Sequence, residues 1–222
     1  MKTVLADIHS QRQRLEDCLQ LINPRFTYRQ ENFESFLSEF GIDYFSDVHR
    51  GLFTVKAGSQ VILSTTLDSA NSYLPCFRHT NQLEQFKAWI GMPDALFQEG
   101  SLVFDRELPS EPWSSRHLTS ATELTPREQE DLQKAGYAYL FGNSQLPLVA
   151  SYQSILEKLH APFAVAVWAI EKIRVEAGSS LVVQGKLPAA LILGELEIVA
   201  GGNIQLCAPT HLMVQKLEKI SL

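Results

Sequence analysis

Three glutamates in the C-terminal third of the chain are of the residue type that performs acid–base chemistry. Glu195 and Glu197 are two residues apart, so they share one face if this stretch is a strand. Glu176, from the preceding stretch, could join them in a carboxylate cluster of the kind that acts on sugars. The alternative is a solvated face, because Leu196 and Ile198 alternate with these glutamates and would take the buried side. The alternation favours the solvated face.

A second set of candidate residues lies in a polar stretch near the middle of the chain. Trp113, Arg116 and His117 bring an aromatic ring, a guanidinium and an imidazole close together in the sequence. Such side chains on a loop can bind a small anion or a sugar. The alternative is that Trp113 packs back onto the body of the protein. These three residues and the three glutamates are candidate binding residues, and none of them is assigned a catalytic role.

The sequence motifs of the common enzyme mechanisms are absent. There is no Gly-x-Ser-x-Gly elbow, phosphate-binding glycine loop, dinucleotide fingerprint or His-Glu-x-x-His pair. The histidines never fall at the short spacing of metal ligands. They are His9, His49, His79, His117, His160 and His211. We therefore expect no metal site and no cofactor.

Charge and hydropathy exclude two classes of partner. The net charge is −6 and no run of the chain clusters lysine and arginine, which argues against binding to nucleic acid. The longest apolar stretch is Phe163 to Ile170, whereas a membrane helix needs about 20 apolar residues. We expect neither a nucleic-acid partner nor a membrane partner.

The N-terminus and the cysteines bear on the compartment. Residues 1–21 include three acidic side chains, so they lack the uninterrupted apolar core of a signal peptide. Cys18, Cys76 and Cys207 are odd in number and far apart, which fits a reducing compartment better than a disulfide scaffold. The expected location is cytoplasmic.

Helix signals fill much of the first 162 residues. The expected helices cover residues 4–22, 33–40, 81–90, 126–136 and 148–159. The clearest start is at Thr125, where an N-cap precedes Pro126 and the capping-box glutamate Glu128, and Gly136 is the expected end. The polar stretch 107–122 is the best linker candidate.

The most informative feature is an internal repeat. Residues 170–183 align without gaps on residues 193–206, and residues 53–63 follow the same template. The alignment places Ile173 on Leu196 and Gly178 on Gly201. Each copy reads as an alternating strand, a corner whose glycine can adopt positive φ, and a second alternating strand. The copy at residues 52–67 predicts two strands joined by a tight corner.

One such unit cannot bury its own apolar face, but stacked copies can. A repeat of about 23 residues with short strands resembles one coil of a right-handed parallel β-helix or a related β-solenoid. The alternative is a jelly roll or β-sandwich, because antiparallel hairpins use similar corners. The expected fold is thus α+β, with N-terminal and central helices and a C-terminal repeated β-structure, a short right-handed β-solenoid. We expect two regions. Residues 1–162 form a mainly helical region with a β-hairpin-like segment at 52–67, and residues 163–222 form a β-solenoid-like region. The alternative is that both regions belong to one continuous domain.

The end of the chain bears on assembly. Residues 211–222 interleave apolar and charged side chains and would supply one more strand, the alternative being a terminal helix. An open solenoid end exposes unpaired backbone groups, so we expect a homo-oligomer or another protein partner. The function expected is that of a non-catalytic binding or self-assembling protein acting through its β-surface. The alternative is an enzyme of unrecognised type, with carbohydrate as the candidate substrate, and a sugar or another small molecule is then the expected ligand.

Overall fold

The computed structural model describes residues 26–29, 32–66, 73–92, 94, 107–110 and 123–221. The protein is a mixed α/β chain containing two parallel sheets. It divides into two compact units. The helical unit contains residues 80–88 and 92–163. The β unit contains residues 19–79, 89–91 and 164–222. Residues 1–18 group with the helical unit but lie outside the described part of the chain. The predicted helix at residues 4–22 therefore also lies outside the described residues.

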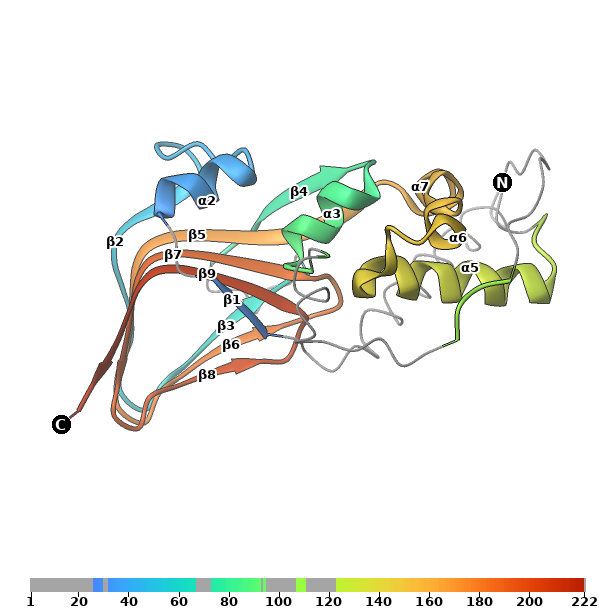
Figure 1. Ribbon diagram of the computed structural model, residues 1–222. Coiled ribbons are helices and arrows are strands. Elements are labelled where there is room, and N and C mark those ends of the chain that lie inside the picture. The colour runs from blue at the N-terminus through green and yellow to red at the C-terminus, as the bar shows by residue number, and fades with distance from the viewer. Residues whose placement is uncertain are drawn as a thin grey trace, which may run out of the picture. The chain divides into compact units, whose positions relative to one another are not determined.

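The elements follow in this order along the chain (Figure 1). They are β1 (Phe26–Arg29), α2 (Phe33–Glu39), β2 (Val48–Val55), β3 (Gln60–Ser64), β4 (Cys76–Thr80), α3 (Leu83–Trp89), α5 (Pro126–Ala138), a π-helix (Tyr139–Asn143), α6 (Pro147–Ala150), α7 (Gln153–His160), β5 (Phe163–Val175), β6 (Ser180–Gln184), β7 (Ala189–Val199), β8 (Asn203–Leu206) and β9 (Thr210–Ile220).

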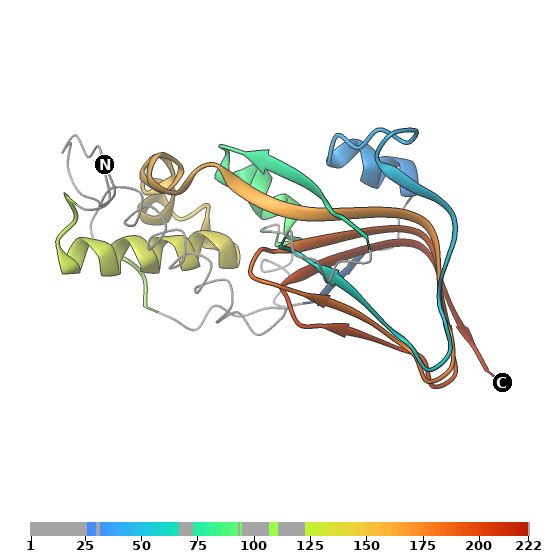
Figure 2. The same ribbon diagram turned by 180° about the vertical axis from the view of Figure 1, so that it is seen from behind.

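The strands of the β unit form two sheets. The larger sheet has the order β1-β9-β7-β5-β2, with β4 also paired to β5, and the smaller sheet has the order β3-β6-β8. The chain crosses from the larger to the smaller sheet after β2, β5 and β7, and Figure 2 shows these corners stacked on one another. Backbone hydrogen bonds join neighbouring corners, as where the Gly178 amide donates to the Gly201 carbonyl at 3.0 Å.

The parallel ladders pair the residues that the sequence alignment places together. Ile173 lies beside Leu196, and Phe53 lies beside Ile173 in the next ladder. In the smaller sheet, Leu181 pairs with Ile204. The strands β2 and β3, which were expected as a hairpin-like segment, lie in different sheets and pair in parallel with β5 and β6. The final stretch is strand β9 and not a terminal helix.

The core of the β unit lies between the two sheets. Its members are buried apolar side chains from the inward faces of both. In β7 the inward residues are Leu191 and Leu193, and then, after Gly194, Leu196. The inward face thus changes from odd to even positions at Gly194, because the strand bends there. A side chain cannot stand at this bend, since a Cβ on Gly194 would lie 2.5 Å from the Glu171 carbonyl oxygen.

In the helical unit, the predicted start of α5 is confirmed. The Thr125 side chain accepts from the Glu128 amide, and the Glu128 carboxylate accepts from the Thr125 amide. The predicted end at Gly136 is wrong, because the helix continues through Gly136 to Ala138 and then into the π-helix. The residue with positive φ is Gly142, at 88°, whereas Gly136 packs against Leu156 inside the helix. The helix expected over 148–159 is divided into α6 and α7 by Ser151 and Tyr152.

Candidate functional site

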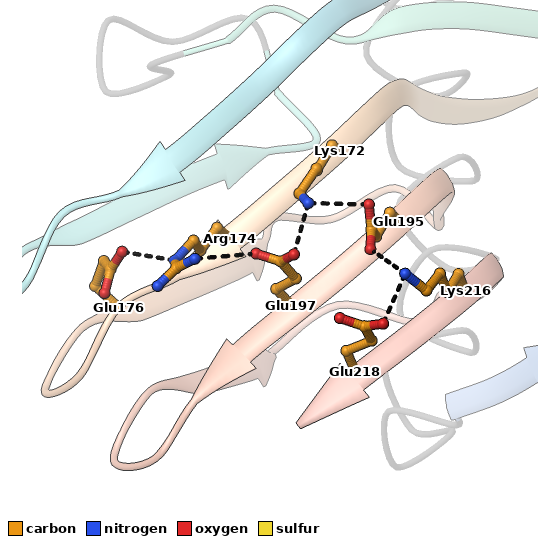
Figure 3. A network of polar contacts seen from close by, with 7 residues as sticks. All are labelled: Lys172, Arg174, Glu176, Glu195, Glu197, Lys216 and Glu218. Atoms are coloured by element: carbon orange, nitrogen blue, oxygen red, sulfur yellow. Dashed lines mark hydrogen bonds and ion pairs between the residues drawn. The ribbon is translucent and has the colours of Figure 1, made fainter. Parts of the chain in front are cut away.

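Seven charged side chains lie together on the outward face of the larger sheet (Figure 3). We call them the charge network: Lys172, Arg174, Glu176, Glu195, Glu197, Lys216 and Glu218. The register of the parallel strands sets their order, because Lys172 of β5, Glu195 of β7 and Lys216 of β9 are direct neighbours across the sheet. The alternation of these strands puts the charges on the face opposite to the core.

Each of the three glutamates named from the sequence is held by cations. Glu195 contacts the Lys172 ammonium at 3.0 Å and the Lys216 ammonium at 2.8 Å. Glu197 contacts Lys172 at 2.6 Å and the Arg174 guanidinium at 3.4 Å. Glu176 contacts Arg174 at 2.8 Å. The structure therefore does bring the three carboxylates to one surface, where lysine and arginine separate them.

Burial differs among these carboxylates. Glu176 and Glu195 are partly exposed, as expected for a solvated face, whereas Glu197 is only 7% exposed. The difference arises because Glu197 lies between Lys172 and Arg174, whose side chains lie close against it. Hydrogen bonds from Lys216 and then from Lys172 hold the pKa of Glu195 below its usual value. A carboxyl in this environment stays ionised at neutral pH, which is the opposite of what a general acid requires.

The carboxylates of Glu195, Glu197 and Glu218 are close enough to share a cation. One carboxylate oxygen from each residue lies within 4.8 Å of the other two. Oxygen ligands at such spacing suit a hard divalent ion. The ammonium groups of Lys172 and Lys216 already contact these carboxylates, however, so the negative charge that would attract a metal ion is compensated. The arrangement is that of a salt-bridge network on a sheet.

A cavity of about 580 Å³ lies beside the charge network, in the β unit. It is lined by Asn32, Phe33, Glu34, Tyr44, Glu171, Gly194, Glu195, Gln215 and Lys216. Helix α2 borders it because α2 packs on β7 and β9, and the bend at Gly194 forms part of its wall. Acidic, amide and aromatic side chains line it together, which suits a polar small molecule better than an apolar one.

Glu171 fastens Tyr44, in the segment between α2 and β2, and Gly51 of β2 to this wall. Its carboxylate accepts hydrogen bonds from the Tyr44 hydroxyl and, at 2.5 Å, from the Gly51 amide. The Tyr44 hydroxyl and then the Gly51 amide hold the pKa of Glu171 below its usual value. The sequence analysis did not identify Glu171. A signal was present, because the alignment of the two repeat copies places Glu171 on Gly194, where the alternation of inward and outward residues changes.

The Glu171 contact should make stability depend on pH. Because the pKa of Glu171 is lower in the folded protein than in the unfolded chain, where it is near 4.5, its ionisation stabilises the fold at pH values above 4.5. This stabilisation is lost as the pH falls through the pKa of the folded state. We expect Glu171→Gln to unfold at lower urea concentration than wild type at pH 7, with a gap that narrows below pH 4.5. Tyr44→Phe removes the hydrogen bond that lowers the pKa of Glu171 most, so this variant should show the same pH dependence of its unfolding midpoint. A gap that stays constant from pH 7 to pH 3 would contradict this role.

The helical unit contains a buried ion pair that the sequence did not predict. The Lys87 side chain is completely buried, and its ammonium contacts the Asp94 carboxylate. The Ser144 hydroxyl donates to the same carboxylate. The Lys87 ammonium also lies 5.3 Å from the centre of the Tyr139 ring, a cation–π distance. Because the Lys87 side chain is buried, we expect its contacts with Asp94 and Tyr139 to affect the stability of the helical unit.

Three of the six candidate residues fall outside the described part of the chain. These are Trp113, Arg116 and His117, and only residues 107–110 of the candidate linker are described. Among the described residues, no helix is long and apolar enough to cross a membrane.

Comparison with known proteins leaves the structure as the basis for function. No protein-family model matches the chain, and no curated protein or solved structure is significantly similar to it.

Proposed function

We propose that the β unit is a short right-handed β-solenoid, and that the protein is a non-catalytic binding or self-associating protein acting through this β-surface. The strands β2 and β3 would form one layer, β5 and β6 the next, and β7 and β8 the third, with β9 opening a fourth. The parallel registers support this reading, since a jelly roll is built of antiparallel strands.

The observation that carries the proposal is the open edge after the third layer. Among the described residues, no strand pairs with the outer edge of β8. On β9, the described pairing with β1 covers Thr210–Met213, and Leu217 beyond it is among the exposed apolar side chains. The backbone N–H and C=O groups of such an edge are free to pair with another chain. We call this edge of β8, together with the exposed side chain of Leu217 on β9, the open edge.

Apolar side chains reinforce the open edge. Ile204 and Leu206 occupy the positions of the fully buried Leu181 and Val183 of the previous layer, yet they are only partly buried. Leu217 occupies the position of Leu196 and is 40% exposed, whereas Leu196 is 1% exposed. Covering these side chains would remove apolar surface from water, so association at this edge is favourable.

The alternative of a carbohydrate-active enzyme has less support. Such chemistry needs a carboxylic acid that can give up a proton and a second carboxylate free to act on the sugar. Glu195 and Glu197 are instead ion-paired with Lys172, and the pKa of Glu195 is lowered. The cavity beside them is better suited to bind a polar molecule than to transform one.

Sedimentation velocity over micromolar concentrations tests the proposal. We expect wild type to self-associate and Leu217→Lys to weaken association about tenfold or more, because each copy would bury a charge at the contact. Leu146→Lys is the matched control, since Leu146 is 39% exposed, close to the 40% of Leu217, but belongs to the helical unit, and its replacement should leave association unchanged. A wild-type protein that is monomeric throughout would overturn self-association as the function.

A further inference from the structure

We propose that the cavity under helix α2 binds a small organic cation, one whose head is an ammonium or guanidinium group. The lining residues come from α2, from the residues that flank it, and from β5, β7 and β9, so the site lies within the β unit. Figure 1 shows α2 over the larger sheet, on the side away from the smaller sheet. Leu217 and β8 take no part in this lining, so the inference goes beyond self-association and does not depend on it.

The size of the cavity suits an organic molecule better than a single metal ion. Its volume is about 580 Å³, and small-molecule sites in proteins occupy roughly 300–1,000 Å³. One water takes up about 30 Å³ in the liquid, so a metal ion with about six waters would fill less than half of the cavity. The volume therefore favours a ligand with a carbon framework.

The charged groups of the wall favour a cation. Among the described residues, three carboxylates line the cavity, those of Glu34, Glu171 and Glu195, and they face a single ammonium, that of Lys216. The charge network beside the cavity carries four carboxylates and three cations, so it does not reverse this balance. The potential in the cavity is then negative, which attracts a cationic ligand and repels an anionic one.

Two of the carboxylates lie close to an aromatic ring. The hydrogen bond to Glu171 is the main reason that the pKa of the Tyr44 hydroxyl is raised, and the charge of Glu34 adds to it. The Arg50 charge acts in the opposite direction, but its guanidinium lies 6.0 Å from the centre of the Phe45 ring, outside the lining. Carboxylates beside an aromatic ring are the combination that binds ammonium and guanidinium groups.

The hydrogen-bonding groups of the wall also match such a head. The Glu171 carboxylate accepts from the Tyr44 hydroxyl and the Gly51 amide, and a carboxylate has about four lone-pair sites, so it can accept further hydrogen bonds. Ammonium and guanidinium groups are donors only. A ligand with N–H donors can therefore bind at Glu171 without displacing Tyr44 or Gly51.

Calorimetric titration of the whole chain with agmatine tests the class of ligand. Agmatine has a guanidinium at one end and an ammonium at the other. We expect it to bind with a Kd of about 0.1–1 mM, and this affinity should fall as sodium chloride is added, because salt screens the attraction between charges. Glucose and glutarate, which are neutral and anionic, should give no binding in the same range. Magnesium chloride is the control for an inorganic cation.

Two variants of the wall should change the affinity in opposite directions. Glu34→Gln removes one negative charge from the cavity and should weaken agmatine binding about tenfold. Lys216→Gln removes the ammonium that opposes a cation and that holds Glu195 at 2.8 Å, so it should strengthen binding about threefold or more. Glu130→Gln is the matched control. It makes the same change of charge at an exposed carboxylate of the helical unit and should leave the affinity unchanged.

The opposite signs distinguish a binding role from a structural one. Thermal melting of each variant checks that it is folded, and a structural defect would weaken binding in both variants. Agmatine binding that falls in Glu34→Gln and rises in Lys216→Gln would support the site. Absence of agmatine binding at about 10 mM, tighter binding of glucose or glutarate, or binding of magnesium alone would overturn the cationic class. Agmatine binding that neither variant alters would overturn the placement in this cavity.

Discussion

Replacing Asp94 with alanine is expected to destabilise the helical unit by about 3–5 kcal/mol. The Lys87 side chain has no exposed surface, and Asp94 is the carboxylate that its ammonium contacts. Removing that carboxylate leaves an ammonium buried without its counter-charge, and it also removes the acceptor of the Ser144 hydroxyl. Urea unfolding followed by circular dichroism at the helix wavelength measures the loss, since α5 and α7 belong to this unit.

Two further variants identify the cause of that loss. The double variant Lys87→Met/Asp94→Ala should recover most of the stability, because methionine fills the lysine site without a charge. Lys134→Ala should leave the unfolding midpoint almost unchanged, because the Lys134 ion pairs with Glu107 and Glu130 are exposed to solvent. If Asp94→Ala were as harmless as Lys134→Ala, the buried pair would not stabilise the unit.

Replacing Gly194 with alanine is expected to destabilise the β unit by about 3 kcal/mol, near the upper end of the range for overpacking. The new Cβ would lie 2.5 Å from the Glu171 carbonyl oxygen, which is a backbone atom and cannot turn aside. To relieve this contact, β5 and β7 must separate at the bend. The segment held by the Glu171 carboxylate would then shift with it.

Gly58→Ala is the matched control for Gly194→Ala within the same unit. Gly58 has φ of +70° at a corner, but nothing lies within 4 Å of the position of a new Cβ. Its replacement should cost only the left-handed backbone penalty, about 1 kcal/mol. Chemical denaturation of the two variants, monitored by tryptophan fluorescence from the buried Trp168, compares them. Equal losses would mean that the close approach at Gly194 does not constrain the stack.

The stacking of the strands could be predicted from the sequence because the pattern is local and repeated. The alternation around Gly58, Gly178 and Gly201 defines inward positions in each copy, and equivalent positions must meet if every copy is to bury its apolar face. The pairs Ile173 with Leu196 and Val175 with Ile198 follow from that requirement. The same reasoning gave the start of α5, where the cap residues lie within four positions.

The end of α5 shows where local signals stop being sufficient. Gly136 is a plausible C-cap by sequence, but it lies inside the helix and next to Leu156 of α7. The left-handed turn is made instead by Gly142, within the span of the π-helix. Which glycine ends a helix depends on what the helix packs against, and a single stretch of sequence does not contain that information.

By itself the sequence determined the strand alternation, the glycine corners and the outward position of Glu195 and Glu197, because each depends on residues close together in the chain. Only the tertiary structure decided that Glu197 is buried between Lys172 and Arg174, that Glu171 binds Tyr44, and that Lys87 meets Asp94 in the interior. The physical reason is that the surroundings of a charge are set by neighbouring strands and helices, and these are brought together only when the chain folds. The outer edge of β8, which no described strand pairs with, is the same kind of property, since an edge exists only once the neighbouring strands have been placed.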